Sequence, residues 1–175
     1  MSAFRSVPPD QKSSKDRRPH PPRLSKPAPS LQATTLWTYP SRTYGSTKQG
    51  DDNFRGATPA WVIWDLIQRY VPPNGLVIDP FCGSGTTLDV CKDTERRGIG
   101  FDVNPVRADI QNADARSLPA KSGIADMVFM DPPYGDNLEY SNDPRCIGKI
   151  SPKDQRLDRA LDLCFAEAHR VLRDG

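Results

Sequence analysis

Two short clusters in the chain combine residue types that ligand-binding and catalytic loops use. The first reads D-P-F-C-G-S-G-T-T from Asp79 to Thr87, and the second reads D-P-P-Y from Asp131 to Tyr134. Glycines let a backbone turn sharply and approach a ligand closely. The first cluster is not a dinucleotide fingerprint, because Leu88 stands where a third glycine is needed, and it lacks the lysine of a phosphate-binding loop. A pyrophosphate ligand is therefore disfavoured.

The first cluster resembles the S-adenosylmethionine-binding motif of the nucleobase amino-methyltransferases, which methylate adenine at N6 or cytosine at N4. The second cluster resembles the D-P-P-Y catalytic motif of the same family, and the resemblance covers roughly residues 56–175. It implies S-adenosylmethionine as the cofactor, DNA as the partner and a part in restriction–modification. The cofactor-binding residues that it implies in the first cluster are Asp79, Pro80, Phe81, Cys82, Gly83, Gly85 and Thr86.

Four further residues are assigned to the cofactor by their places along the chain. Asp102 ends the second predicted strand, where acidic residues commonly bind ribose hydroxyls. Asp114 and Ala115 follow the third predicted strand, where the family contacts the adenine of the cofactor. Thr58 and Pro59 match part of a family motif that binds the methionine carboxylate. A helix N-cap at Thr58 with Pro59 at the first helical position explains the same two residues.

The catalytic residues that the resemblance implies are Asp131, Pro132, Pro133 and Tyr134. An exocyclic amino nitrogen is a poor nucleophile, because its lone pair is delocalised into the ring. The carboxylate of Asp131 and the carbonyl of Pro132 can each accept one amino hydrogen, which turns the lone pair toward the methyl donor. The two prolines fix the backbone, and Tyr134 offers a ring on which a flipped-out base can stack.

Other polar residues near the clusters receive a structural interpretation. Cys82 lies inside the cofactor loop, so a small packed side chain is favoured over a nucleophile. Glu139 and Tyr140 follow the second cluster and could approach the substrate, although a solvated loop is favoured. The cysteines form no C-x-x-C pair, so neither a metal site nor a disulfide framework is indicated.

Hydrophobic periodicity places both clusters directly after strands. Apolar residues from Ile63 to Tyr70 predict a first helix, and prolines 72 and 73 stop it. Strands are predicted at 76–79, 98–103, 110–113 and 124–130, with helices at 86–96 and 153–172. The apolar stripe predicted for the last helix consists of Leu157, Leu161, Cys164, Phe165, Ala168 and Leu172.

This alternation of strands and helices predicts the α/β class, with a doubly wound, mostly parallel, Rossmann-like methyltransferase sheet. We expect the third and second strands on one side of the first strand and the fourth strand on the other. The chain ends after the helix that follows the fourth strand, where a fifth strand normally continues the fold. We therefore expect a C-terminally truncated core, or a homodimer or partner subunit that covers the exposed strand edge.

Composition divides the chain into three parts. Residues 1–35 are predicted to be a disordered basic arm, since they are rich in Pro and Ser and the first 30 carry seven Lys or Arg against two Asp. The arm either binds nucleic acid or solubilises the protein. Residues 36–55 form an aromatic and basic lead-in loop, which either stacks on bases or, as we favour, packs Trp37 and Tyr39 on the body. Residues 56–175 are the methyltransferase core.

The predicted reaction is methyl transfer from S-adenosylmethionine to a nucleobase amino group, with adenine N6 in DNA first and cytosine N4 second. Adenine comes first because the family's N4-cytosine members more often carry Ser at the first motif position. One alternative is an RNA N2-guanine methyltransferase, which Gly135 after the second cluster keeps open. Another is a non-catalytic cofactor- or nucleic-acid-binding subunit. The sequence has no membrane-length apolar run and no secretory h-region, which predicts a cytoplasmic protein without a membrane partner.

Overall fold

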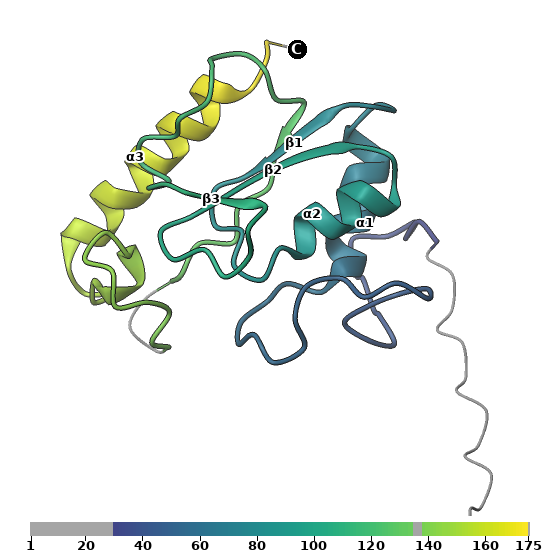
Figure 1. Cartoon of the computed structure of the whole chain (residues 1–175), viewed down its shortest axis with the longest axis horizontal. Helices are drawn as coiled ribbons and strands as arrows, with labels where there is room; N and C mark the ends of the chain where they lie inside the picture. The colour runs from purple at the N-terminus through teal and green to yellow at the C-terminus, as the bar shows by residue number, and fades with distance from the viewer. Residues whose placement is uncertain (1–29, 135–137, 175) are drawn as a thin grey trace, which may run out of the picture.

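A four-stranded parallel sheet forms the centre of the computed structural model, which describes residues 30–134 and 138–174 (Figure 1). Most of the predicted basic arm, residues 1–35, and Gly135 lie outside the described residues. The strands are β1 (Leu76–Asp79), β2 (Arg97–Asp102), β3 (Ile110–Asn112) and β4 (Met127–Val128). They lie in the order β3–β2–β1–β4, and every pairing is parallel. The predicted strand order and the α/β class are confirmed.

Helices cover both faces of the sheet, as Figure 1 shows. Val77 of β1 packs with apolar residues of α1 (Ala60–Tyr70) and α2 (Thr86–Asp93) on one face. The neighbouring Leu76 and Ile78 pack on the opposite face with Val171, at the end of α3 (Gln155–Val171). Side chains alternate between the two faces of a strand. All four residues of β1 are buried, as expected of a central parallel strand between two helical layers.

Four predicted elements are shorter in the structure. The strand predicted at 110–113 ends at Asn112, and the helix predicted at 153–172 spans Gln155–Val171. The strand predicted at 124–130 contains only the two residues of β4, which is an edge strand and pairs on one side alone, with β1. The helix predicted at 86–96 ends at Asp93, because Glu95 adopts a left-handed backbone conformation with φ of 56°. A non-glycine residue in that region cannot continue a right-handed helix.

The stripe predicted for the last helix is wrong at Phe165, which is 58% exposed. Because the helix advances about 100° per residue, Phe165 points away from the buried line that runs past it. Leu161 is half-buried and Leu172 packs against the edge of the core. The residues that α3 buries are Leu157, Ala160, Cys164, Ala168 and Val171.

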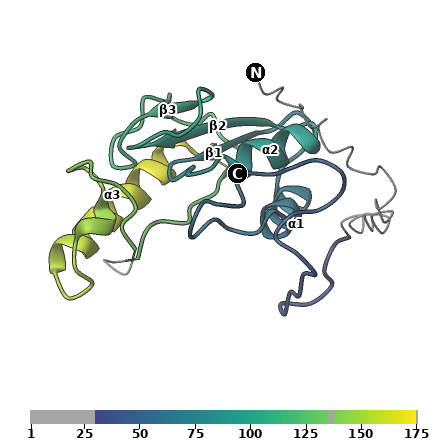
Figure 2. The same ribbon diagram turned by 60° about the horizontal axis from the view of Figure 1, so that its bottom comes forward.

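The segment before α1 packs along that helix, as the purple-to-blue part of the chain in Figure 2 shows. The ring of Tyr39 stacks on Trp61 at 5.6 Å between centroids, and its hydroxyl donates to Asp65 Oδ2 at 2.9 Å. Asp65 is fully buried. The guanidinium of Arg69 lies 5.6 Å from the centre of the Trp37 ring. Trp37 and Tyr39, the two residues of the lead-in loop that were expected to pack on the body, therefore both contact it.

The connection from β4 to α3 contains a short 3-10 helix, η1 (Ile147–Lys149). Within the described ranges, no helix has both the length and the apolar character that a membrane span requires.

Candidate active-site cleft

A cleft of about 990 Å³, including the part open to solvent, lies at the carboxyl ends of the strands. One aspartate from each strand end lines it. Asp79 and Asp102 are the last residues of β1 and β2, while Asp114 and Asp131 follow β3 and β4 within three residues. Crevices beyond the strand ends are where open parallel sheets bind ligands.

The glycine turn between β1 and α2 forms one wall of this cleft. Phe81, Cys82, Gly83 and Thr86 of the predicted cofactor loop line the cleft, whereas Pro80 and Gly85 do not. The positive φ of Gly83 (48°) and Gly85 (81°) makes the turn possible. Burial raises the pKa of the Cys82 thiol, so this cysteine stays protonated and packs as a small side chain.

Asp79 is buried beneath the start of this turn and forms hydrogen bonds to it. Its carboxylate accepts hydrogen bonds from the Thr87 hydroxyl at 2.6 Å and from the backbone N–H of Phe81 at 3.0 Å. The residue is 3% exposed. Burial raises the pKa of Asp79 to about 7, and the two hydrogen bonds oppose that rise. This group therefore titrates near neutral pH.

Asp102 connects the turn to the neighbouring strand. Its Oδ2 accepts from the backbone N–H of Gly83 at 2.9 Å, and its Oδ1 accepts from Asn104 N at 2.8 Å. A carboxylate has about four lone-pair sites, so Asp102 keeps acceptor capacity toward the cleft. The predicted ribose contact is compatible with this position.

Asp114 and Ala115 line the cleft beyond β3. Asp114 forms a bidentate ion pair with Arg116, with Nη2–Oδ2 at 2.6 Å and Nε–Oδ1 at 2.9 Å. Burial acts to raise the pKa of Asp114, but the hydrogen bonds from Arg116 outweigh it and hold that pKa below its usual range. Ala115 is buried. Together the two residues present a fixed negative charge beside an apolar surface.

The four D-P-P-Y residues follow β4, and all of them line the same cleft as the first turn. The hydroxyl of Thr58 donates to Oδ2 of Asp131. No side-chain cap is present at the start of α1, whose N-cap residue is Pro59, so the capping role predicted for Thr58 is wrong. The Thr58 hydroxyl contacts the Asp131 carboxylate instead. Tyr134 is 68% exposed, which leaves its ring accessible from solvent.

Several cleft-lining residues have no signal in the sequence pattern, among them Phe54 and Arg145. The Phe54 ring lies against Gly83, where a Cβ atom would come within 3.0 Å of it. Tyr140 also lines the cleft and packs against Gly56 and Gly148, so the solvated position favoured for it is wrong. Its sequence neighbour Glu139 is exposed. A contact between distant loops leaves no local periodicity, and for this reason the pattern does not reveal it.

The fold and the cleft define a parallel α/β protein with a ligand site across the ends of its strands. Residues 5–113 match the model of the N6/N4 DNA methylase family, and the chain belongs to this family. The matched range contains the first cluster and Asp102 but ends before Asp131. The roles assigned to the second cluster therefore depend on its own motif and on the geometry of the cleft.

Three type II methyltransferases are similar to parts of the chain. The type II methyltransferase M.ScaI of Streptomyces caespitosus is 31% identical over 93 residues, which cover 49% of this chain and 30% of that enzyme. M.Cfr9I of Citrobacter freundii is 38% identical over 52 residues, covering 30% and 17% of the two chains. M.XycI of Xanthomonas campestris pv. cyanopsidis is 40% identical over 47 residues, covering 27% and 16%. The chain thus spans less than a third of each relative.

Proposed function

We propose that the cleft binds S-adenosylmethionine and that the protein transfers its methyl group to an amino nitrogen of a DNA base. Adenine N6 is the first choice of base and cytosine N4 the second. The observation that carries the proposal is that both sequence clusters, which are far apart along the chain, line one and the same cleft. Membership of the DNA methylase family supports DNA over RNA as the substrate.

The charges of the cleft fit this methyl donor. Among the described residues that line it, the carboxylic and basic side chains are four aspartates and Arg145. Asp79, with a pKa of about 7, is mostly protonated below neutral pH. Asp114 and Arg145 are paired with Arg116 and Asp143. The excess negative charge therefore comes from Asp102 and Asp131. S-adenosylmethionine carries a sulfonium and an ammonium group, so excess negative charge favours it. The same charge disfavours a pyrophosphate ligand. We assign Asp102 to the ribose hydroxyls and Asp114 with Ala115 to the adenine of the donor.

The remaining cofactor assignments follow the walls of the cleft. Phe81, Cys82, Gly83 and Thr86 form the surface on which the donor lies, and Thr58 stands at the boundary between the donor and the catalytic carboxylate. When bound, S-adenosylmethionine supplies an electrophilic methyl group.

The chain's own residues prepare the attacking nitrogen. Thr58 holds Oδ2 of Asp131, which leaves Oδ1 to accept an amino hydrogen of the base. The carbonyl of Pro132 accepts the other hydrogen, and Pro133, packed against Gly148, keeps the loop in place. Tyr134 stacks on the flipped base. These groups position the nitrogen and stabilise the charge that develops on it.

Tritium transfer from labelled S-adenosylmethionine tests the proposal, with duplex DNA, single-stranded DNA and bulk tRNA as acceptors. We expect label in N6-methyladenine after digestion of the DNA. Asp131→Asn should lower the rate by about 10²–10³-fold, the usual loss for one preorganised transition-state group. Asp162→Asn, at an exposed position of α3, is the control and should retain full activity.

Three outcomes would contradict parts of this proposal. Full activity in Asp131→Asn would remove the catalytic assignment. Label in the guanine of tRNA would replace the DNA substrate with RNA. Donor binding by calorimetry without label in any acceptor would show that this chain is a cofactor-binding subunit rather than a complete enzyme.

A further inference from the structure

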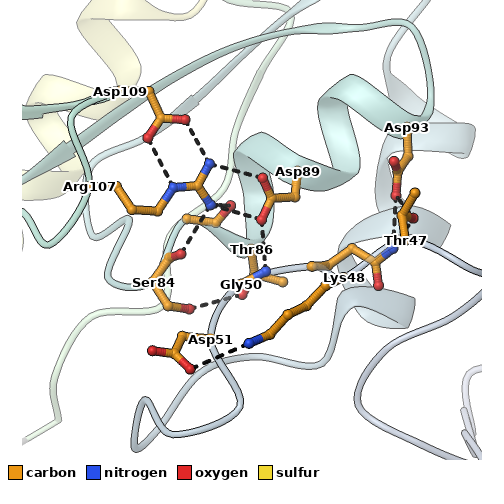
Figure 3. Close-up of polar contacts among 12 residues, drawn as sticks. Thr47, Lys48, Gly50, Asp51, Ser84, Thr86, Asp89, Asp93, Arg107 and Asp109 are labelled. Atoms are coloured by element: carbon orange, nitrogen blue, oxygen red, sulfur yellow. Dashed lines mark hydrogen bonds and ion pairs between the residues drawn. The ribbon is translucent and has the colours of Figure 1, made fainter.

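The side chain of Arg107, in the connection between β2 and β3, makes hydrogen bonds to four other residues (Figure 3). Its guanidinium binds Asp89 of α2 with Nη1–Oδ2 at 2.8 Å and Nη2–Oδ1 at 2.9 Å. It binds Asp109 with Nε–Oδ1 at 2.9 Å and Nη2–Oδ2 at 2.7 Å. Paired bonds of this kind fix the plane and direction of a guanidinium group.

The same guanidinium also binds the glycine turn that lines the cleft. Nη1 donates to the carbonyl of Ser84 at 3.2 Å and to that of Gly85 at 3.3 Å. A Cβ atom on Gly85 would lie 2.4 Å from this nitrogen. The glycine therefore allows Arg107 to lie directly on the turn. Arg107 itself is not among the described residues that line the cleft.

Asp89 extends this connection to a second wall of the cleft. Its Oδ2 also accepts from the backbone N–H of Gly50 at 2.8 Å. Asp93, one helical turn further along α2, accepts from Thr47 Oγ1 at 2.9 Å and from Gln49 Nε2 at 2.8 Å. The chain continues from this anchored stretch into Phe54, Gly56, Ala57 and Thr58, which line the cleft.

We infer that Arg107 is a positioning residue for the methyl-donor site, acting through the carbonyls of Ser84 and Gly85 and through Asp89. The inference rests on the proposed function, because it takes the glycine turn as the donor-binding surface. Arg107 fixes the turn from the side away from the cleft, while Asp89 fixes the stretch that leads to Phe54 and Thr58. Both walls of the donor site are therefore preorganised before the donor binds.

Arg170 offers a matched control for a purely structural role. Its side chain is 33% exposed, close to the 31% of Arg107. It likewise pairs with a carboxylate, Glu167, and donates to two carbonyls, those of Ala120 and Leu118. These partners do not line the cleft. Loss of either arginine should lower stability, but only loss of Arg107 should weaken donor binding.

The experiment measures S-adenosylhomocysteine binding by calorimetry for the full chain and for Arg107→Ala, Arg107→Lys and Arg170→Ala. We expect at least tenfold weaker binding in Arg107→Ala and binding within twofold of the wild type in Arg170→Ala. Arg107→Lys should show an intermediate loss, because an ammonium group cannot span both carboxylates and both carbonyls. This milder variant decides the question if Arg107→Ala does not fold.

Hydrogen exchange gives a readout that does not depend on the ligand. The Gly85 amide donates to the Cys82 carbonyl at 2.8 Å, and it should exchange faster in Arg107→Ala but not in Arg170→Ala. Equal binding by the wild type and both Arg107 variants would overturn the inference and leave the proposed function intact. Failure of the wild-type chain to bind S-adenosylhomocysteine or S-adenosylmethionine would overturn the proposed function, and the inference with it.

Discussion

Replacement of Asp79 by asparagine should remove a defined part of the pH dependence of stability. Asp79 is 3% exposed at the end of β1, and burial raises its pKa from 3.8 to about 7. Between these two values the carboxyl is protonated in the folded protein and ionised in the unfolded chain. Its contribution to stability is therefore complete below pH 3.8 and is lost as the pH rises through 7.

The size of this effect follows from the shift. Over a range where the folded state binds one more proton than the unfolded state, the free energy of unfolding falls by about 1.4 kcal/mol per pH unit. Between pH 5 and pH 7, the titration of Asp79 should thus lower the free energy of unfolding by about 2–3 kcal/mol. Asparagine has nearly the same shape and cannot ionise, so it should not contribute to this slope.

Urea unfolding of the wild type and of Asp79→Asn at pH 5, 6, 7 and 8 measures the difference. Other titrating groups affect both proteins equally, so subtraction isolates Asp79. We expect the stability of the wild type relative to the variant to fall up to pH 7 and to level above it. Parallel curves across the whole range would show that Asp79 is ionised in the folded protein and would refute the reasoning.

The proposed donor adds a second readout at the same residue. A sulfonium and an ammonium group favour the ionised carboxylate, so donor binding should strengthen between pH 6 and pH 8 in the wild type. Asp79→Asn should bind with less dependence on pH over this range. A pH-independent affinity in the wild type would show that the cationic groups lie away from Asp79.

Gly85→Ala and Gly123→Ala should both lower the free energy of unfolding, because alanine is strained at a positive φ. The loss should be about 1–3 kcal/mol larger for Gly85→Ala. Both glycines have positive φ, but of the two only Gly85 has a neighbour, Arg107, that an added Cβ would meet. Urea unfolding of the two variants measures the difference. Equal losses would contradict the close contact. Tyr39→Phe should cost about 1–3 kcal/mol, because it removes a hydrogen bond from the buried carboxylate of Asp65. A loss under about 0.5 kcal/mol in the same assay would mean that another donor replaces the hydroxyl.

The sequence was sufficient to predict the framework of the fold. Short apolar runs that alternate with amphipathic helices specify a parallel sheet, and the order β3–β2–β1–β4 agrees with that prediction. Because parallel strands end at one edge, acidic residues after each run had to gather there. Asp79, Asp102, Asp114 and Asp131 do so. The proposed cofactor and catalytic roles were predicted from local motifs.

Tertiary structure decided the contacts between segments that are distant in sequence. Thr58 suits a helix N-cap by its local sequence, yet its hydroxyl bonds to Asp131, 73 residues away. Phe165 suits an apolar stripe, yet it stays exposed because α3 packs on the core through a different line of residues, which includes Cys164 and Ala168. Arg107 shows no motif at all, although it connects α2 to the glycine turn. Local patterns fix secondary structure and chain direction, whereas such partners are chosen only when the packed elements bring their side chains together.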